Sequence, residues 1–326
     1  MRHGQNPAKF IDQVHQPQSV TVAVVTYIPF LSGYYADSLK VLKACLGSIW
    51  QNTDLPYDLL VFDNASCEEV RQYLQEAHRQ GKIQYLVLSQ ENVGKAGAWN
   101  FIFGAAPGET IAYADSDIYF YPGWLSAQLK VLQTLPQVGM VTGMPLRTPE
   151  QFSTATVAWA ESAPDVSVER GPLLAWEDYW RHSRSLGASQ EQARQQYDTT
   201  GDVRVTYQGL TCFVGAGHFQ FVAPKAVLQQ VLPIPSRRPM GQVRLLDVAI
   251  NEAGYRRFST SQWWVRHLGN TLEGEDSGAA EPVQAGETVP RQEAAGRWQK
   301  LFQWKPVRRV LLAIYDRIFG IYFRTV

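Results

Sequence analysis

The chain has 326 residues, of which 45% are hydrophobic and 18% charged, a composition that supports a packed core and excludes an intrinsically disordered protein. Its 30 basic and 30 acidic side chains cancel, so no overall basic surplus indicates a nucleic acid as partner. The cysteines, Cys45, Cys67 and Cys212, are few and far apart, which excludes a disulfide framework or a zinc site and fits a reducing, cytoplasmic compartment.

The first half of the chain alternates short apolar segments with amphipathic ones. The expected strands are 20–27, 57–63, 83–88, 110–115 and 138–145, and the expected helices are 38–51, one ending at about 79, 95–105 and 124–135. Strands and helices that alternate with short links predict a parallel sheet with right-handed crossovers, within an α/β fold. Ligands of such sheets bind at the carboxyl ends of the strands, where Asp63, Asn92 and the pair Asp115 and Asp117 are expected to lie.

The pattern weakens after residue 145. Residues 147–201 are expected to form a polar, helical insertion packed over the sheet, and order returns at 210–233, which is strand-like and then helical after Pro224. We therefore expect one catalytic domain over residues 1–270, with a donor half at about 20–145, the insertion at about 147–201 and an acceptor half at about 202–270. Residues 271–290 contain five acids and no base, and they read as a linker.

The last segment, 291–326, has a surplus of six basic residues, with apolar and aromatic residues at helical spacing. It is too short and too charged to span a bilayer, and no other stretch of the chain is apolar enough to predict a spanning helix or a signal peptide. An amphipathic helix of this kind fits two roles equally well. It either lies in a membrane interface, at the cytoplasmic face, or docks on the catalytic domain or a second copy of the chain.

The triplet Asp115-Ser116-Asp117 follows an apolar strand and precedes an aromatic run. Two neighbouring carboxylates repel each other and need a compensating positive charge when they are buried. Alternate residues of an extended segment project to one side, so Asp115 and Asp117 can approach one Mg²⁺ or Mn²⁺ ion together. The alternative is a surface turn with two solvated acids.

Two further segments carry candidate ligand contacts. Asp63 ends the second predicted strand, where its carboxylate can accept hydrogen bonds from a ribose or a base; capping of the next helix by Asn64 or Ser66 is the structural alternative. In "ENVGKAGAWN" the glycines Gly94 and Gly97 precede a helix, an arrangement that lets the backbone approach an anion and that also occurs in simple turns. The P-loop pattern is absent from it.

In this order and spacing, the segments "VAVVTY", "DNAS", "ENVGKAGAWN", "DSD" and "HLGN" resemble the family-2-type inverting glycosyltransferases of GT-A fold. The resemblance covers about residues 20–270 and implies a Rossmann-like, mostly parallel sheet flanked by helices. It also implies a hexosyltransferase with a nucleotide-diphosphate sugar as donor and a polysaccharide, glycolipid or glycoprotein as acceptor. The implied donor-binding residues are Thr26, Tyr27, Asp63, Asn92, Gly94, Lys95 and Ser116, and the implied metal ligands are Asp115, Asp117 and His267.

The resemblance is weaker on the acceptor side. Asp247 in "RLLDVAINEAGY" is the candidate general base, because a carboxylate within hydrogen-bond reach can take the proton of the attacking hydroxyl. The family usually has an acidic pair here, whereas this chain has Asp247 alone with Glu252 further on, and an acid in the first turn of a helix is the structural alternative. His218 and Glu252 are further acceptor-site candidates, with a satisfied core histidine in an apolar run as the more common structural alternative for His218. His78 and His182, in polar helices, are given no role.

Two other classes of function fit the same fold. A nucleotidyltransferase that makes the sugar nucleotide would need basic residues in the loop after the first strand, and "TYIPFLSGYY" has none. A non-catalytic module that binds a sugar nucleotide or a glycan would retain the fold without turnover. The base of the donor, its sugar, the acceptor and the linkage stay open at the level of sequence.

Overall fold

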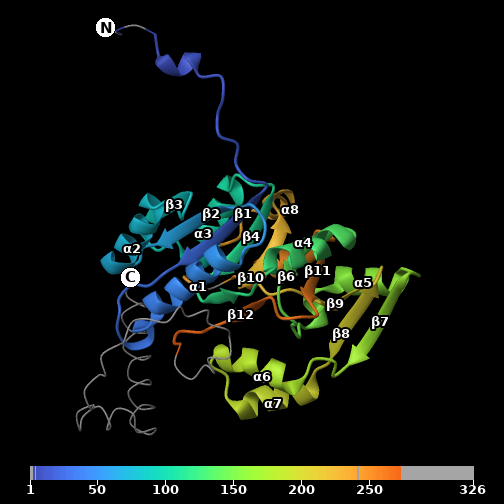
Figure 1. The fold of residues 1–326 in the computed structure, drawn as a ribbon. Coiled ribbons are helices and arrows are strands. Elements are labelled where there is room, and N and C mark those ends of the chain that lie inside the picture. The colour runs from blue at the N-terminus through green and yellow to red at the C-terminus, as the bar shows by residue number, and fades with distance from the viewer. Residues whose placement is uncertain (1–2, 4, 241, 273–326) are drawn as a thin grey trace, which may run out of the picture. The chain divides into compact units, whose positions relative to one another are not determined.

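The structure of the chain, a computed structural model, describes residues 3, 5–240 and 242–272 (Figure 1). They belong to one compact unit, Met1–Glu275. The acidic linker expected at 271–290 lies almost entirely outside the described residues, and the basic helix expected at 291–326 lies wholly outside them. None of the helices in the described part is long and apolar enough to cross a bilayer.

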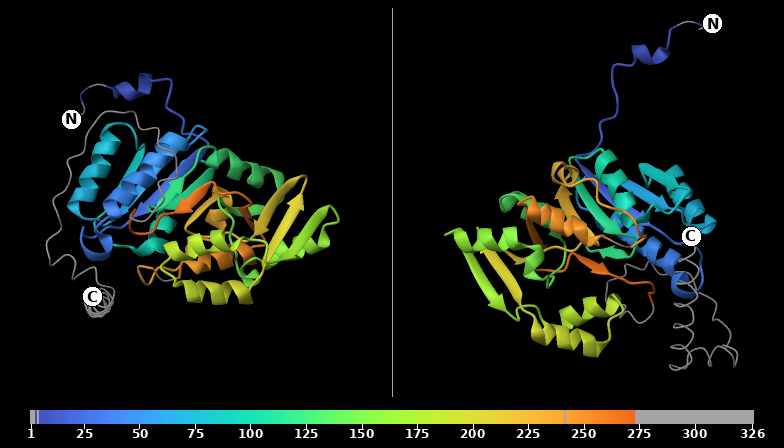
Figure 2. Two further views of the ribbon diagram at one scale, coloured as in Figure 1. Left: turned by 60° about the horizontal axis from the view of Figure 1, so that its bottom comes forward. Right: turned by 180° about the vertical axis from the view of Figure 1, so that it is seen from behind.

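A ten-stranded sheet runs through the described residues in the order β3-β2-β1-β4-β10-β6-β11-β9-β8-β7 (Figures 1 and 2). The strands are β1 (Val20–Thr26), β2 (Asp58–Asn64), β3 (Tyr85–Ser89), β4 (Thr110–Asp115), β6 (Val138–Thr142), β7 (Val166–Gly171), β8 (Asp202–Tyr207), β9 (Leu210–Val214), β10 (Gln220–Pro224) and β11 (Arg256–Thr260). A separate two-stranded sheet pairs β5 (Ile118–Phe120) with β12 (Val265–His267) in antiparallel fashion.

The first four strands confirm the parallel half that the sequence predicts. Strands β2, β1 and β4 lie side by side in parallel, with β3 outside β2. The residues of β2 are all buried, as a strand covered by helices on both faces requires. The sheet as a whole is mixed, because β10 enters between β4 and β6 antiparallel to both, and β9, β8 and β7 continue it as an antiparallel edge.

Helices cover both faces of this sheet. They are α1 (Ser38–Asn52), α2 (Glu68–Arg79), α3 (Gly94–Ala105), α4 (Trp124–Thr134), α5 (Thr154–Ser162), α6 (Trp176–Ser185), α7 (Gln190–Thr199), α8 (Lys225–Gln230) and α9 (Arg244–Glu252), with short 3₁₀ turns at Pro7–Phe10, Gly33–Tyr35 and Glu150–Phe152. One core cluster joins α1, α2 and α4 to the sheet, and a second joins α3, α8 and α9 to the opposite face.

The insertion expected over 147–201 differs from the prediction in two respects. It holds the predicted polar helices, α6 and α7, which pack side by side away from the sheet (Figures 1 and 2). It also holds β7, which pairs with β8 and extends the sheet instead of lying over it. The sequence analysis missed this strand because its segment "VSVERG" contains exposed charged residues. At the edge of a sheet only one face of a strand needs apolar side chains.

Candidate active site

The carboxyl ends of the parallel strands bring the candidate residues to one edge of the sheet. Thr26 at the end of β1 is in register with Asp63 of β2, and its neighbour Val25 is in register with Asp115 of β4. Thr26 is buried and its hydroxyl oxygen has no hydrogen-bond partner among the described residues. The strand ends therefore converge as predicted, and Thr26, Asp63 and Asp115 lie at the carboxyl edge of the sheet.

Asp115 is held by groups from two neighbouring elements. Lys95 of α3 donates from Nζ to Asp115 Oδ2 at 2.6 Å, and the Tyr113 hydroxyl donates to Oδ1 at 2.5 Å. The Lys95 ammonium also lies 5.2 Å from the ring centroid of Trp99. Burial, reinforced by the charge on Asp115, raises the pKa of Tyr113 well above its ordinary value, so this phenol stays a hydrogen-bond donor. The positive charge beside Asp115 is thus supplied by Lys95.

Asp117 contacts His267, whereas Asp115 contacts Lys95 and Tyr113. His267 Nε2 lies 3.2 Å from Asp117 Oδ2, and His267 Nδ1 lies 3.1 Å from the hydroxyl oxygen of Ser185 in α6. Burial opposes the charge on both partners, but the Asp117 carboxylate raises the pKa of His267, and His267 with Lys95 lowers the pKa of Asp117. This contact joins β12 to the turn before β5.

Helix α6 closes one side of this pair. Besides Ser185, it carries His182, whose ring lies 5.2 Å from that of Phe219 and 6.2 Å from that of His267. His182, to which the sequence analysis gave no role, therefore packs against His267 and Phe219. The sequence signal was available in the spacing of His182 and Ser185, three residues apart and so on one face of the helix.

The donor set of Asp117 and His267 fits a divalent cation. Asp117 Oδ1 is buried and has no hydrogen-bond partner among the described residues, and a carboxylate oxygen beside an imidazole nitrogen suits Mn²⁺ or Mg²⁺. Ser185, at His267 Nδ1, is placed to orient that imidazole. The described residues contain no group of three His, Cys, Asp or Glu side chains arranged for a metal, and Asp115 contacts Lys95.

The glycine segment has protein partners at its helix start. Gly94 has a φ of +74°, and a Cβ there would lie 2.8 Å from the hydroxyl oxygen of Ser236, so glycine is required by the approach of segment 236–239. The Lys95 N–H donates to the Pro239 carbonyl, and the Gly97 N–H donates to Ser236 Oγ. The open, anion-binding helix start expected from the sequence is therefore replaced by contacts within the chain.

Asp63 and Asn92 are also engaged by the protein. The buried Asp63 carboxylate accepts from the Ser66 N–H at 3.2 Å and from Arg71 Nε at 3.2 Å. Burial raises its pKa, against the opposing effect of these hydrogen bonds. Asn92 Oδ1 accepts from Asn64 Nδ2 and from the Gly94 N–H. Neither Asn64 nor Ser66 caps α2, whose N-cap is Cys67 without a side-chain hydrogen bond.

A second constellation lies on the acceptor half and joins two predicted candidates. Asp247, in the first turn of α9, has Oδ2 2.8 Å from His218 Nδ1 and Oδ1 2.6 Å from Arg257 Nη2. Arg257 is fully buried, and burial lowers its pKa despite the nearby Asp247 charge. The sequence analysis missed Arg257, since an arginine in the strand "RRFST" gives no sign of pointing inward.

The remaining candidates are more peripheral. Glu252 is exposed at the end of α9, five residues after Asp247 and so roughly 140° around the helix from it, which separates it from His218. Ser116 lies in the turn between β4 and β5 and is partly buried. The Tyr27 ring packs edge-on against Tyr35, 6.4 Å away, in the loop after β1.

Comparison with known proteins identifies the protein family to which this chain belongs. The family model for Glycosyl transferase family 2 matches residues 34–203, just over half of the chain, so the chain belongs to this family. A curated relative, the uncharacterized glycosyltransferase alr2836 of Nostoc sp. strain PCC 7120, is 26% identical over 137 residues. That alignment covers 40% of this chain and 42% of the relative, so the match spans about two fifths of the relative's length.

Solved structures with a similar chain trace include TarS and a mannosyltransferase. Residues 1–349 of TarS from S. aureus align with a TM-score of 0.45 at 14% identity, over 77% of this chain and 60% of that one. The mannosyltransferase PcManGT from Pyrobaculum calidifontis, in complex with GDP-Man and Mn²⁺, aligns with a TM-score of 0.44 at 18% identity, over 77% of this chain and 56% of that one.

Proposed function

We propose that this chain is a metal-dependent inverting glycosyltransferase that moves a sugar from a nucleotide-diphosphate donor to a hydroxyl acceptor on a glycan or lipid carrier. The observation that carries the proposal is the Asp117–His267 pair at the carboxyl edge of the sheet, where Asp117 Oδ1 is buried and has no hydrogen-bond partner in the described part of the chain. Membership of the family supports the reaction class. The TarS structure in complex with UDP-GlcNAc and the PcManGT complex supply probes for the donor.

The residues of the donor edge have distinct tasks in this reaction. Asp117 and His267 would hold Mn²⁺ or Mg²⁺, with His267 oriented by Ser185. A bound divalent ion stabilises the negative charge that develops on the leaving diphosphate. Lys95, in contact with Asp115, places a second positive charge at the same edge. At the strand tip, Thr26 offers a hydroxyl that forms no hydrogen bond with any described residue to a polar group of the nucleoside, beside the predicted base-binding residues Asp63 and Tyr27.

The acceptor side supplies the proton acceptor. Inversion requires a base on the face of the sugar opposite the leaving group, and the constellation of Asp247 and His218 belongs to the acceptor half, next to the strand that follows β4 in the sheet. The new bond forms between the acceptor oxygen and the anomeric carbon. The bond from that carbon to the phosphate oxygen breaks, its electron pair leaves with the diphosphate, and the hydroxyl proton passes to the base.

A thermal-shift panel tests the donor edge. UDP, GDP and dTDP are added with and without Mn²⁺, and one of them is expected to raise the melting temperature by several degrees in the presence of the metal, since a ligand at 100 times its Kd stabilises by about 2.7 kcal/mol. The variant Asp117→Asn should lose this shift. The matched control Asp198→Asn, an exposed acid on α7, should retain it. A metal-dependent shift that survives Asp117→Asn would contradict the assignment.

Turnover separates the proposed function from its rivals. With UDP-GlcNAc, GDP-mannose and other sugar nucleotides, a transferase releases the nucleoside diphosphate slowly to water and faster to an acceptor. A non-catalytic module would bind without release. A nucleotidyltransferase would instead release pyrophosphate from a nucleoside triphosphate and a sugar phosphate.

A further inference from the structure

Asp247 is poorly placed to meet an acceptor itself. Its side chain is 8% exposed, whereas that of His218 is 26% exposed. Both carboxylate oxygens are already used, Oδ1 by Arg257 at 2.6 Å and Oδ2 by His218 at 2.8 Å. An incoming hydroxyl would have to displace one of these partners to reach Asp247.

Arg257 is the buried counter-charge of Asp247. Its guanidinium is fully buried and donates to the carbonyl oxygens of Phe152, at 2.5 Å, and of Ala216. If Asp247 took up a proton, the Arg257 charge would remain buried without a counter-charge, and an unpaired buried charge of this kind is strongly destabilising. A carboxylate fixed in this way suits orientation of a neighbour better than acceptance of a proton.

The contact with Asp247 defines the tautomer of His218. Because an ionised carboxylate only accepts hydrogen bonds, His218 Nδ1 must carry the hydrogen, and in the neutral ring Nε2 then presents a lone pair. No described residue forms a hydrogen bond with Nε2. This is the arrangement of a histidine base positioned by an aspartate, in which the second nitrogen is free to take a proton.

The surroundings of His218 connect it to the donor edge. The carbonyl of the next residue, Phe219, accepts from the Asp115 N–H at 2.8 Å, so the segment before β10 runs directly beside the end of β4. The His218 ring packs edge-on against Trp99, with centroids 6.3 Å apart, and Trp99 in turn lies over Lys95. Gly217, on the other side, is fixed by a 2.8 Å hydrogen bond from its N–H to Thr142 Oγ1.

We propose that His218 is the catalytic base, with Nε2 accepting the proton of the acceptor hydroxyl, and that Asp247 and Arg257 are positioning residues that hold His218 in the required tautomer. This inference rests on the proposed glycosyl transfer. The hydroxyl oxygen bonds to the anomeric carbon as its proton moves to Nε2, and the diphosphate leaves with the electron pair of the broken bond. The resulting imidazolium is stabilised by Asp247 and releases its proton to water after the products leave.

The proposal makes transfer depend on a neutral imidazole. Asp247 of α9 contacts the ring, Arg257 of β11 contacts Asp247, and Lys95 of α3 lies 5.2 Å from the centroid of the Trp99 ring that packs against His218.

The test uses full-length chain, Mn²⁺ and a panel of UDP-, GDP- and dTDP-sugars, with release of nucleoside diphosphate to water or to an added alcohol as the readout. His218→Ala is expected to lower kcat by about 10²–10⁴-fold with little change in the KM for the donor. Added imidazole should restore part of the rate. Asp247→Asn should also lower kcat, and the double variant should be no slower than His218→Ala alone, because the two residues act as a unit.

Two controls separate a loss of catalysis from a loss of folding. His78→Ala, an exposed histidine at the end of α2, should transfer at the wild-type rate, and His218→Gln with a melting curve checks that the loss is not one of folding. Nitrogen-15 NMR of the metal-free chain should show an unprotonated Nε2 for His218 that changes in Asp247→Asn. An active wild type with an equally active His218→Ala overturns this inference alone. A wild type without any release overturns the proposed function and this inference with it.

Discussion

His182 shows how one imidazole next to the site couples folding to pH. Its Nδ1 is buried without a hydrogen-bond partner among the described residues, and burial, with the charge on His267, lowers its pKa to about 3. In the unfolded chain a histidine titrates near 6.5. Between these values the unfolded state binds one proton more than the folded state, so the free energy of unfolding falls as the pH falls.

We therefore expect His182→Leu to flatten the acid side of the stability profile. Between roughly pH 6 and pH 4 the wild type should lose up to about 1.4 kcal/mol per pH unit more than the variant, the value for one proton. Urea unfolding of the metal-free chain at several pH values measures this difference. His78→Leu, at an exposed position, should retain the wild-type slope. Equal slopes for His182→Leu and the wild type would contradict the buried, neutral state of this ring.

At the residue scale, the sequence predicted what local patterns encode. The Asp-Ser-Asp triplet placed Asp115 and Asp117 at the end of a strand, and the histidine of "VRHLGN" was expected near them; the structure brings His267 to Asp117. What the sequence did not predict are partners from distant segments. The turn of Asp115 toward Lys95, and the contact of Ser185 with His267, depend on how α3 and α6 pack, which no local spacing records.

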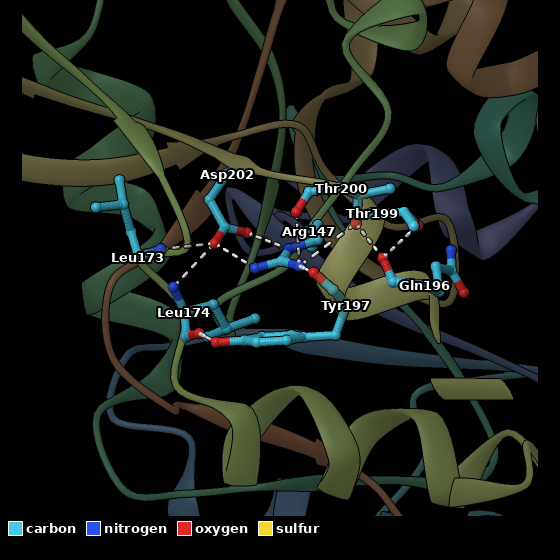
Figure 3. Close-up of polar contacts among 8 residues, drawn as sticks. All are labelled: Arg147, Leu173, Leu174, Gln196, Tyr197, Thr199, Thr200 and Asp202. Atoms are coloured by element: carbon cyan, nitrogen blue, oxygen red, sulfur yellow. Dashed lines mark hydrogen bonds and ion pairs between the residues drawn. The ribbon is translucent and has the colours of Figure 1, made fainter. Parts of the chain in front are cut away.

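At the element scale, a buried ion pair fixes the helices α6 and α7 to the sheet (Figure 3). Arg147 forms two hydrogen bonds of 2.7 Å with Asp202 at the start of β8, and it also donates to the Tyr197 carbonyl in α7. Asp202 accepts from the N–H groups of Leu173 and Leu174, in the segment that leads into α6. One carboxylate therefore ties the entry to α6 and, through Arg147, the end of α7.

Asp202→Asn should destabilise the chain by about 3–5 kcal/mol, because Arg147, 4% exposed, would remain buried without its counter-charge. Denaturant unfolding gives the value. Glu169→Gln, which removes the carboxylate of an exposed ion pair with Arg204, should leave the midpoint of the unfolding transition unchanged. Since α6 carries Ser185 and His182, we also expect Asp202→Asn to weaken the metal-dependent thermal shift. A variant as stable as the wild type would show that Arg147 and Asp202 do not anchor this segment.

The secondary-structure elements, like the residues, divide into those that local sequence patterns predict and those that depend on distant partners. The parallel strands β1 to β4 and their helices were predictable because each is a continuous apolar run or an amphipathic stripe. The position of β10 between β4 and β6 was not, since strand order depends on pairing between distant segments. The three-residue strands β5 and β12 were also missed, because the pattern of so short a segment does not distinguish a strand from a loop.

At the scale of the whole molecule, the described unit contains its own core. The three apolar clusters all lie between Val20 and Val265, and they join both halves of the sheet to the helices around it. The unit Met1–Glu275 also contains each candidate site residue. Folding and donor binding should therefore need no residue after 275, whatever the basic segment 291–326 does.

A chain truncated after Glu275 is expected to retain the circular dichroism spectrum, the unfolding midpoint within a few degrees, and the metal-dependent shift with nucleoside diphosphate. Loss of the cooperative transition would show that the C-terminal segment is part of the fold. Vesicles of anionic phospholipid then separate the two roles of 291–326, since each basic residue near such a surface contributes about 1 kcal/mol of attraction. If the segment is interfacial, the full chain sediments with the vesicles and the truncated chain does not. If the segment pairs two copies of the chain, truncation instead lowers the molecular mass of the protein in solution. Sedimentation with the vesicles then does not change.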